Sequence, residues 1–281
     1  MKKIIFFIFL LSLTHLNSQS SIDCNSNLSI FAEYYKVKNY EAAYEPWMSV
    51  RKECPKINPA IYFQGSRMLD EFIKNSEGEL KVSYQNDLLK LYDEWVTNFP
   101  AYNGRSIVGQ IMSNKAQKMF DYKLASKSEI YNLFENAYQT DPVSFDDPKP
   151  LYTYFKTYFE LYKEGNSEIT LSEIFNKYEE LDERYNSIID EYSKQIDIII
   201  NKENSGVALT SREKRNKKVY EINSNASNIY LRNLNAIIAK ESTCENLIPL
   251  YQKNLEENKT NPVWLNRAAS RMDSKECSDD P

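Results

Sequence analysis

The stretch KNYEAAYEPWMSVRKECP, residues 38–55, predicts the fold of this chain. Its packing residues recur every three or four positions, which places them on one face of an α-helix. These are Tyr40, Ala43, Trp47 and Val50. A closing proline follows, and Pro ends a helix because it lacks a backbone N–H and clashes with the preceding turn. We therefore expect a helix with one aromatic and small-residue face, ending at that proline.

The residues before this stretch predict a partner helix. Residues 29–37 carry apolar side chains on one side, namely Ile30, Phe31, Tyr34 and Tyr35. Lys38-Asn39 then forms a turn, so the two helices make an antiparallel hairpin. Pro46 lies inside the second helix and is expected either to kink it or to mark a late start.

Two later stretches end in the same way. LLKLYDEWVTNFP ends at Pro100, and EIYNLFENAYQTDP ends at Pro142. Their expected packing faces are Leu88, Leu91, Tyr92 and Trp95 in the first, and Ile130, Leu133, Phe134, Ala137 and Tyr138 in the second. Three proline-closed helices at similar spacing indicate a repeated hairpin. The chain has only six glycines, which favours an all-α protein over a β-sandwich rich in glycine turns.

Residues 171–200 have a different, heptad-like pattern. Apolar residues alternate at three and four positions over about four heptads: Leu171, Ile174, Tyr178, Leu181, Tyr185, Ile188, Tyr192, Ile196 and Ile199. A polar segment follows, and a second helix is expected with Val219, Ile222, Ala226, Ile229, Leu234 and Ile237 on its packing face. The pattern predicts an antiparallel coiled-coil arm of roughly 45 Å. One continuous helix is the alternative, but Gly206 favours reversal.

The charges of this region allow two interpretations. The basic run Arg212, Lys214, Arg215, Lys217 and Lys218 stands out in an acidic chain. It is either a positive arm tip that meets an anionic partner or a solubilising face beside acidic residues of the opposing helix. The carboxylates Glu179, Glu180, Asp182 and Glu183 are expected on the solvated face of the long helix.

The first residues indicate export. MKKIIFFIFLLSLTHLNSQS has two lysines followed by a short apolar run, as in a secretory signal peptide, with cleavage expected after Ser18. The apolar run falls short of the roughly 20 residues that cross a bilayer, which argues against an uncleaved anchor. Cys24 does not follow a lipobox-like segment, which argues against a lipoprotein. No later segment is long and apolar enough to span a membrane, so we expect an exported protein.

The four cysteines are expected to form disulfides in an oxidising compartment. Three pairings are possible for Cys24, Cys54, Cys244 and Cys277. Each outer pair is separated by about one helix–turn–helix unit, whose two ends lie close together in an antiparallel hairpin. Local pairing is therefore natural, and each bond would stabilise the fold by roughly 3 kcal/mol. A metal site is the alternative, but no CxxC spacing supports it.

The residue inventory excludes several kinds of chemistry. The single histidine, His15, lies within the predicted signal peptide, so the mature chain has no imidazole for catalysis or metal binding. A formal net charge of −5 argues against nucleic-acid binding. GRSIVGQ, residues 104–110, has phosphate-loop glycine spacing without the required Lys and Ser/Thr. No catalytic residue, cofactor or metal is expected.

The hairpin at residues 38–55 resembles the tetratricopeptide repeat. That family places an aromatic, an alanine, a second aromatic, a small residue and a proline at the offsets of Tyr40, Ala43, Trp47, Val50 and Pro55. The first helix lacks the family's Trp and Gly, and the proline spacing exceeds the usual 34 residues or so. The segment NLIPLYQKNLEENKTNPVWLNRAASRMDSKEC strengthens a resemblance to exported repeat proteins of Bacteroidota.

The resemblance implies a degenerate helical-hairpin array that binds proteins. The predicted segments are a signal peptide at 1–18, repeat-like hairpins at 19–165, a long antiparallel hairpin at 166–243 and a further hairpin at 244–281, beyond which relatives would continue the array. The implied function is a non-enzymatic, extracytoplasmic scaffold for an unidentified envelope protein. Expected contact residues are Tyr40, Trp47, Tyr92, Trp95, Arg212, Lys214 and Arg215.

Glycan binding or processing in the cell envelope is the alternative function. Glu241-Ser242 is similar to the glutamate-serine pair of lytic transglycosylases. The segment that shapes the active site in that family does not follow it, so the similarity is confined to two residues.

Overall fold

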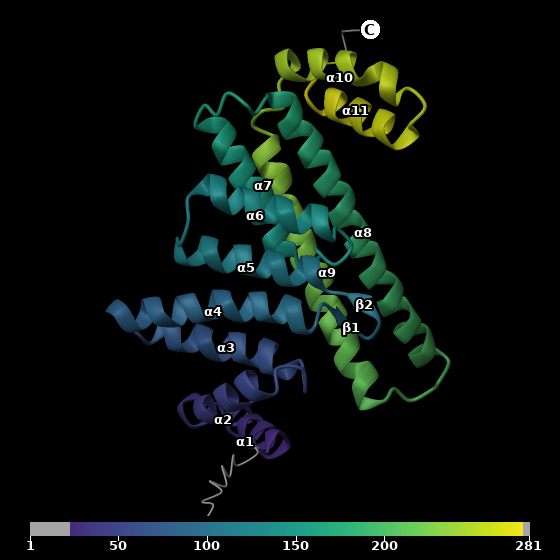
Figure 1. The fold of residues 1–281 in the computed structure, drawn as a ribbon. Coiled ribbons are helices and arrows are strands. Elements are labelled where there is room, and N and C mark those ends of the chain that lie inside the picture. Colours follow the sequence, from purple (N-terminus) through teal and green to yellow (C-terminus); the bar gives the residue numbers. More distant parts are fainter. Residues whose placement is uncertain (1–22, 278–281) are drawn as a thin grey trace, which may run out of the picture. The chain divides into compact units, whose positions relative to one another are not determined.

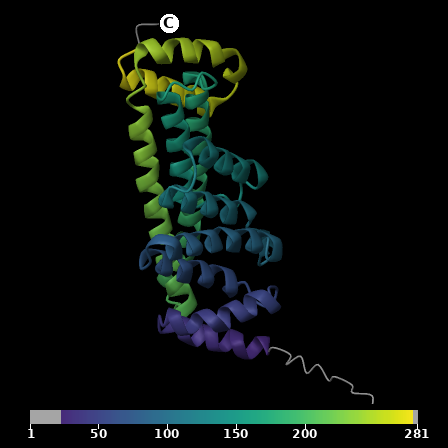
Figure 2. The ribbon, with the colours of Figure 1, turned by 60° about the vertical axis from the view of Figure 1, so that its left-hand side comes forward.

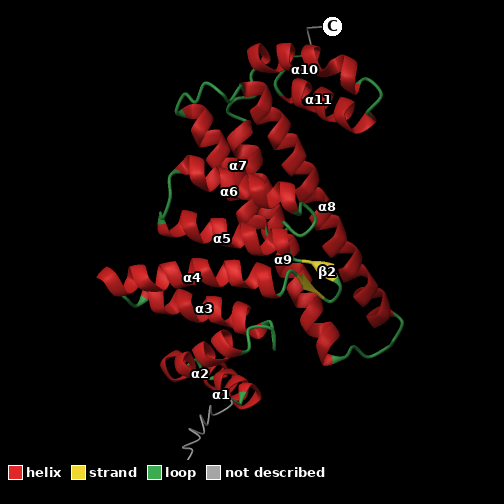
Figure 3. Ribbon diagram, in the orientation of Figure 1, coloured by secondary structure: helices red, strands yellow, loops and turns green. Residues whose placement is uncertain are grey.

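The computed structural model describes residues 23–277, which form an almost entirely helical structure. Within this range there are eleven helices and one short β-hairpin. Figure 3 colours the helices red and the strands yellow. This confirms the predicted all-α class. The predicted signal peptide, residues 1–18, lies outside the described residues. The chain divides into two compact units, residues 1–84 and 85–281, so the predicted repeat region 19–165 is split at Tyr84.

Unit 1 begins with a hairpin of α1 (Cys24–Lys36) and α2 (Tyr40–Glu53), followed by α3 (Ala60–Lys74) and the first part of α4 (Gly78–Asn98). The Asp23 carboxylate caps α1, and the Asn39 side chain caps α2. Capping satisfies backbone N–H groups that have no partner inside the helix. The turn between α1 and α2 is at Val37–Asn39, as predicted.

The packing face predicted for α2 is largely correct. Ala43, Trp47 and Val50 are fully buried, and α2 ends directly before Cys54. Pro46 lies within an α2 that begins at Tyr40, so it does not delay the start of the helix. The predicted face of α1 is wrong in part. Only Phe31 is buried there, whereas Ile30 and Tyr34 are exposed.

Unit 2 starts within α4 and continues through a β-hairpin and α5–α11 (Figure 1). The hairpin pairs β1 (Ala101–Tyr102) with β2 (Arg105–Ser106) in antiparallel register around Asn103-Gly104, which both have positive φ. The following helices are α5 (Val108–Tyr122), α6 (Lys127–Thr140), α7 (Pro148–Lys163), α8 (Leu171–Asn204), α9 (Ser211–Ile238), α10 (Cys244–Asn258) and α11 (Pro262–Ser274).

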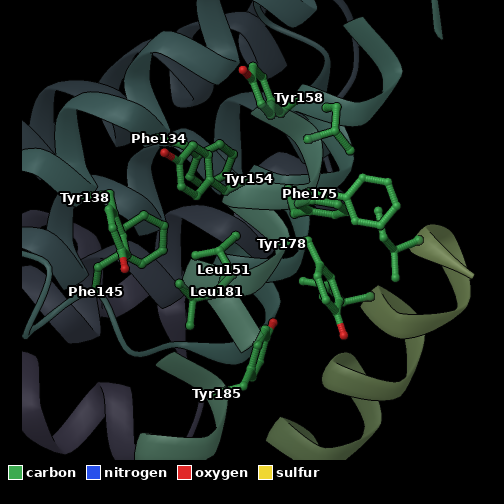
Figure 4. Close-up of a cluster of buried hydrophobic side chains, with 14 of the residues drawn as sticks. Phe134, Tyr138, Phe145, Leu151, Tyr154, Tyr158, Phe175, Tyr178, Leu181 and Tyr185 are labelled. Atoms are coloured by element: carbon green, nitrogen blue, oxygen red, sulfur yellow. The ribbon is translucent and has the colours of Figure 1, made fainter. Parts of the chain in front are cut away.

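The core of unit 2 is rich in tyrosine and phenylalanine. Figure 4 shows this cluster, in which α6, α7 and α8 contribute most of the rings. Aromatic side chains bury large areas, and their hydroxyl groups need partners when buried. The Tyr185 hydroxyl accordingly donates to the Pro148 carbonyl oxygen, and the Tyr178 hydroxyl donates to Asn235 at 2.8 Å.

The helices α8 and α9 form an antiparallel pair. Lys202, near the end of α8, contacts Glu213 in the first turn of α9 at 2.6 Å. At the other end of the pair, the hydroxyl of Tyr178, near the start of α8, donates a hydrogen bond to Asn235, near the end of α9. Gly206, with φ of 79°, lies in the reversal, so the chain forms two helices rather than one. Thr170 and Thr210 begin these helices with capping boxes.

The packing face predicted for α9 is wrong at several positions. Val219, Ile222 and Ile229 are exposed, although they were expected to pack against α8. Leu234 is buried as predicted, and the inward side of α9 also carries the buried Ser227 and Ile238 together with half-buried tyrosines. The inward side of α9 is thus a mixture of aliphatic, aromatic and polar residues, while the side chains of Val219, Ile222 and Ile229 are exposed.

The cysteines pair locally, as the hairpin geometry favours. Cys24 bonds to Cys54 across α1 and α2, with Cα atoms 6.3 Å apart. Cys244 bonds to Cys277 across α10 and α11, with Cα atoms 5.4 Å apart. Both Cα separations are typical of disulfides. Each bond joins the first residue of one helix to a residue within three positions after the end of its partner helix.

Candidate functional site

A groove of about 1130 Å³ runs along α8 within unit 2, and we call it the α8 groove. One side is a face of α8 on which Glu183, Ser187, Asp190 and Lys194 recur at three- and four-residue spacing. The other walls come from segments distant in the sequence. They contribute Arg105 of β2, Val143 and Asp146 of the α6–α7 loop, Tyr220 of α9, and Asn261 and Arg267 at α11.

The lining of the α8 groove is strongly charged but nearly balanced. Its acidic side chains are Asp146, Glu183, Asp190 and Glu191, and its basic side chains are Arg105, Arg184, Lys194 and Arg267. Within residues 23–277, no group of three or more acidic, histidine or cysteine side chains is placed to hold a metal ion. The alternation of charges suits a ligand that itself carries both polar and charged groups.

Asp146 and Arg184 form the most buried charged part of the groove. Burial raises the pKa of Asp146 to about 6, and the nearby Arg184 guanidinium opposes this rise. Arg184 donates to the Val143 carbonyl oxygen. Its buried Nε donates to no atom among the described residues. An unsatisfied buried donor is unfavourable, so burial of this Nε carries a cost in the present arrangement.

Two tyrosines provide aromatic surface in the groove. The rings of Tyr192 and Tyr220 have centroids 6.0 Å apart and are tilted by 31°. The Tyr192 hydroxyl accepts a hydrogen bond from Asn223 at 3.3 Å, and burial raises the pKa of Tyr192. The pair therefore offers flat apolar surface beside carboxylates and amides.

One end of the groove is organised by ion pairs between α11 and α8. Arg267 contacts Asp182 at 3.4 Å and Glu183 at 3.0 Å, while Arg271 contacts Glu179 at 3.4 Å. Glu179 and Asp182 are half-buried, and burial raises the pKa of both carboxyl groups. The prediction that these two residues lie on a solvated face is therefore wrong, because α11 covers them.

The predicted contact residues fall into three groups. Trp47 and Tyr92 are buried, with exposed fractions of 0% and 4%, so in this structure they are packing residues and not a contact surface. Tyr40 and Trp95 are half-buried. The three basic residues near the start of α9 are exposed, namely Arg212, Lys214 and Arg215. Whether the exposed and half-buried residues bind a partner stays a prediction.

The basic run at the start of α9 is only partly neutralised. Lys217 pairs with Glu203 of α8 at 2.6 Å, as the solubilising interpretation expects. Arg212, Lys214, Arg215 and Lys218 form no ion pair with any other part of the described chain. Four uncompensated positive charges remain on one end of the helix pair, and they favour anionic partners.

The sequence did not reveal the α8 groove. Its lining residues are ordinary surface types, and they come from five segments that only the tertiary structure brings together. The alternating charges of α8 were the one available signal, but they are equally typical of a solvated helix. Among residues 23–277, none of the helices has the length and apolar character needed to traverse a bilayer.

Comparisons with known proteins found no match among protein-family models, curated proteins or solved structures.

Proposed function

We propose that this protein is an extracytoplasmic, non-enzymatic scaffold that binds another protein of the cell envelope. The observation that carries the proposal is the α8 groove, which is long, mixed in charge and lined by side chains from five segments. Such a groove matches a polypeptide segment, whose backbone and side chains offer both donors and acceptors. Two disulfides are compatible with an oxidising compartment.

The finer fold assignment belongs to the same proposal. We infer that the hairpins are degenerate tetratricopeptide-like units and that α8 and α9 form an antiparallel coiled-coil arm. The closing residues of α2 and the short helix pairs support the first inference. The 34-residue length of α8 and its buried residues at heptad-like spacing support the second. Cleavage after Ser18 would place the mature protein in the periplasm or outside the cell.

A charge exchange within the groove tests the proposed function. Glu191→Lys combined with Lys194→Glu inverts the local charge pattern of the groove without changing net charge. We expect it to reduce recovery of a protein partner, crosslinked in the native envelope, at least tenfold. The matched control exchanges the exposed pair at the end of α10, Glu256→Lys with Lys259→Glu, and should retain the partner. Equal recovery from all three proteins would contradict a protein-binding role for the groove.

Glycan binding is the second candidate, and the Tyr192–Tyr220 pair favours it. Saccharide sites combine flat aromatic surface with carboxylates and amides, and Asp190, Asn186 and Gln195 line the same groove. This candidate predicts that peptidoglycan fragments raise the melting temperature of the wild-type protein but not of Tyr220→Ala. An unchanged melting temperature in the wild type would eliminate it.

A further inference from the structure

A row of aliphatic side chains lies on the outer side of α9, and we call it the α9 outer row. It consists of Val219, Ile222, Ala226 and Ile229, spaced by three, four and three residues. Val219, Ile222 and Ile229 are exposed to 45%, 56% and 40%, and Ala226 is half-buried. Figure 2 shows α9 in light green at the left edge of unit 2.

The spacing of this row is that of a helix–helix seam. Single exposed aliphatic residues are common, but here they align along one side of a helix. Alternation by three and four is the a/d pattern by which one helix inserts side chains between those of another, and β-branched residues suit such positions. The other side of α9 already packs against α7 and α8 through Tyr230, Ser227 and Leu234. The helix therefore has two packing faces, of which one has no partner among the described residues of unit 2, 85–277.

The charges beside the outer row are almost all positive. Lys218 and Arg232 flank it, and Arg212, Lys214 and Arg215 continue along the same exposed side toward the start of α9. None of these five forms an ion pair with another described residue. Glu221 is the one exposed carboxylate of α9 nearby. A partner that covers the row must bring negative charge, because opposed like charges would be destabilising.

We propose that the outer face of α9 binds an acidic amphipathic helix of a partner protein. The apolar residues of that helix would pack on Ile222 and Ile229, and its flanking carboxylates would face Lys218 and Arg232. The inference rests on the proposed scaffold function and names the chemical class of one partner segment.

Two other occupants fit the observations less well. A second copy of this chain would bring the same basic side chains against each other, and like charges opposed in an interface are destabilising. A lipid surface is favoured by Trp, Phe and Leu on a broad apolar face. The α9 outer row is narrow and consists of Val, Ile and Ala.

A designed peptide tests the proposal on the full chain. The probe is a labelled three-heptad helix with Ile at a, Leu at d and Glu at e and g, and a second peptide carries Lys at e and g. We expect the Glu peptide to bind in fluorescence anisotropy, the Lys peptide to bind at least tenfold more weakly, and hydrogen exchange to slow over residues 211–236. Ile222→Glu should weaken binding of the Glu peptide at least tenfold. Val82→Glu, at a similarly exposed position on α4, should not.

Reversing the charges beside the α9 outer row tests whether those charges decide which peptide binds. Lys218→Glu with Arg232→Glu should reverse the preference, so that the Lys peptide binds more tightly than the Glu peptide. Circular dichroism checks that each variant keeps its helix content. The proposal is overturned if Ile222→Glu binds the Glu peptide as the wild type does, or if the protected amides lie outside α9.

Other outcomes assign the face to a different occupant and equally overturn the proposal. Ile222-dependent binding to phosphatidylglycerol vesicles, without binding to the Glu peptide, would indicate a lipid surface. An Ile222-dependent dimer in sedimentation would indicate a second copy. Failure of this inference is distinguishable from failure of the proposed function. If Glu191→Lys with Lys194→Glu loses the envelope partner while the Glu peptide does not bind the wild type, only the α9 inference is contradicted. Peptide binding on α9 without any envelope partner contradicts only the scaffold function.

Discussion

The Trp47 ring occupies the space in which a side chain on Gly65 would begin. A Cβ on Gly65 would lie 2.6 Å from Cζ2 and Nε1 of Trp47, far inside contact distance. The ring cannot easily move away, because it is fully buried and its Nε1 donates to the Ile61 carbonyl oxygen at 2.7 Å. α2 and α3 therefore approach each other closely because residue 65 is glycine.

This contact predicts that Gly65→Ala destabilises unit 1. We expect a loss of about 2 kcal/mol or more in the free energy of unfolding, since overpacking a rigid core forces side chains and backbone to shift. Chemical denaturation followed by circular dichroism measures it, since this signal does not depend on Trp47. Trp47→Phe should make the added methyl group less harmful, so the double variant should be less destabilised than the sum of the single changes. Strict additivity would mean that the two residues do not compete for space.

The half-buried pair of Arg271 and Glu179 predicts a compensating double substitution. Arg271 lies over the Tyr178 ring at 4.7 Å, donates to the Tyr251 hydroxyl at 2.8 Å and contacts Glu179. Arg271→Met should cost about 2 kcal/mol, because it leaves a half-buried carboxylate without its partner. Adding Glu179→Gln should recover much of that loss. Thermal unfolding monitored by circular dichroism compares them, and a double variant no more stable than Arg271→Met would contradict the argument.

The carboxyl group of Asp146 in the groove predicts that Asp146→Asn stabilises the protein by an amount that depends on pH. Its pKa is about 6 in the folded protein instead of 3.8, mainly because burial disfavours the charged form. The folded state therefore binds more protons than the unfolded state between about pH 4 and 6, and stability falls as pH rises through that range. Asp146→Asn should be nearly neutral at pH 4 and stabilising above pH 6.

The size of this gain is bounded by the difference between the two pKa values, which corresponds to roughly 3 kcal/mol at most. Urea unfolding at a series of pH values measures it. Asp197→Asn, at an exposed position on α8, is the control and should show no such trend. A gain of equal size at pH 4 and pH 8 would show that charge burial is not its cause.

The Cys244–Cys277 disulfide predicts that the stability of α10 and α11 depends on oxidation of these two cysteines. Replacing both Cys244 and Cys277 by alanine removes a link that closes a 33-residue separation, and should lower stability by roughly 3 to 4 kcal/mol. Since α10 and α11 have few other links to each other, the loss should appear first as faster hydrogen exchange in these two helices. Wild-type protein treated with a reductant should behave similarly. Unchanged exchange in α10 and α11 would contradict a stabilising role for the bond.

Local features of this fold, such as helix ends and turns, could be predicted from the sequence. The side of α9 that faces the interior could not. Proline and cysteine positions fix where α2 ends and which hairpin ends meet, because their effects act over a few residues. The inward face of α9 was predicted correctly at Leu234 and wrongly at Ile222 and Ile229, which are exposed although they are more hydrophobic than Tyr220 and Ser227 on the inward side. Hydropathy alone does not show which of two faces meets the rest of the same chain.

In the candidate sites, too, local features could be predicted from the sequence, whereas features set by tertiary packing could not. The exposure of the basic residues Arg212, Lys214 and Arg215 agrees with expectation, because a run of charges near a turn is seldom buried. Trp47 was assigned to a contact surface by its aromatic character, yet it fills the core of unit 1. The pairing of Arg267 with Asp182 joins residues far apart in the chain, and no local pattern indicates it.

Site-specific photo-crosslinking in the cell that produces the protein tests the central claim most directly. A photo-reactive residue is placed in turn at Ser187 in the α8 groove, at Asn225 on the outer side of α9, and at the exposed control position Lys253 on α10. The proposed function predicts a discrete protein adduct from Ser187, the α9 inference predicts one from Asn225, and neither predicts one from Lys253. An absence of protein adducts from both Ser187 and Asn225, or the same adducts at all three positions, would contradict the account.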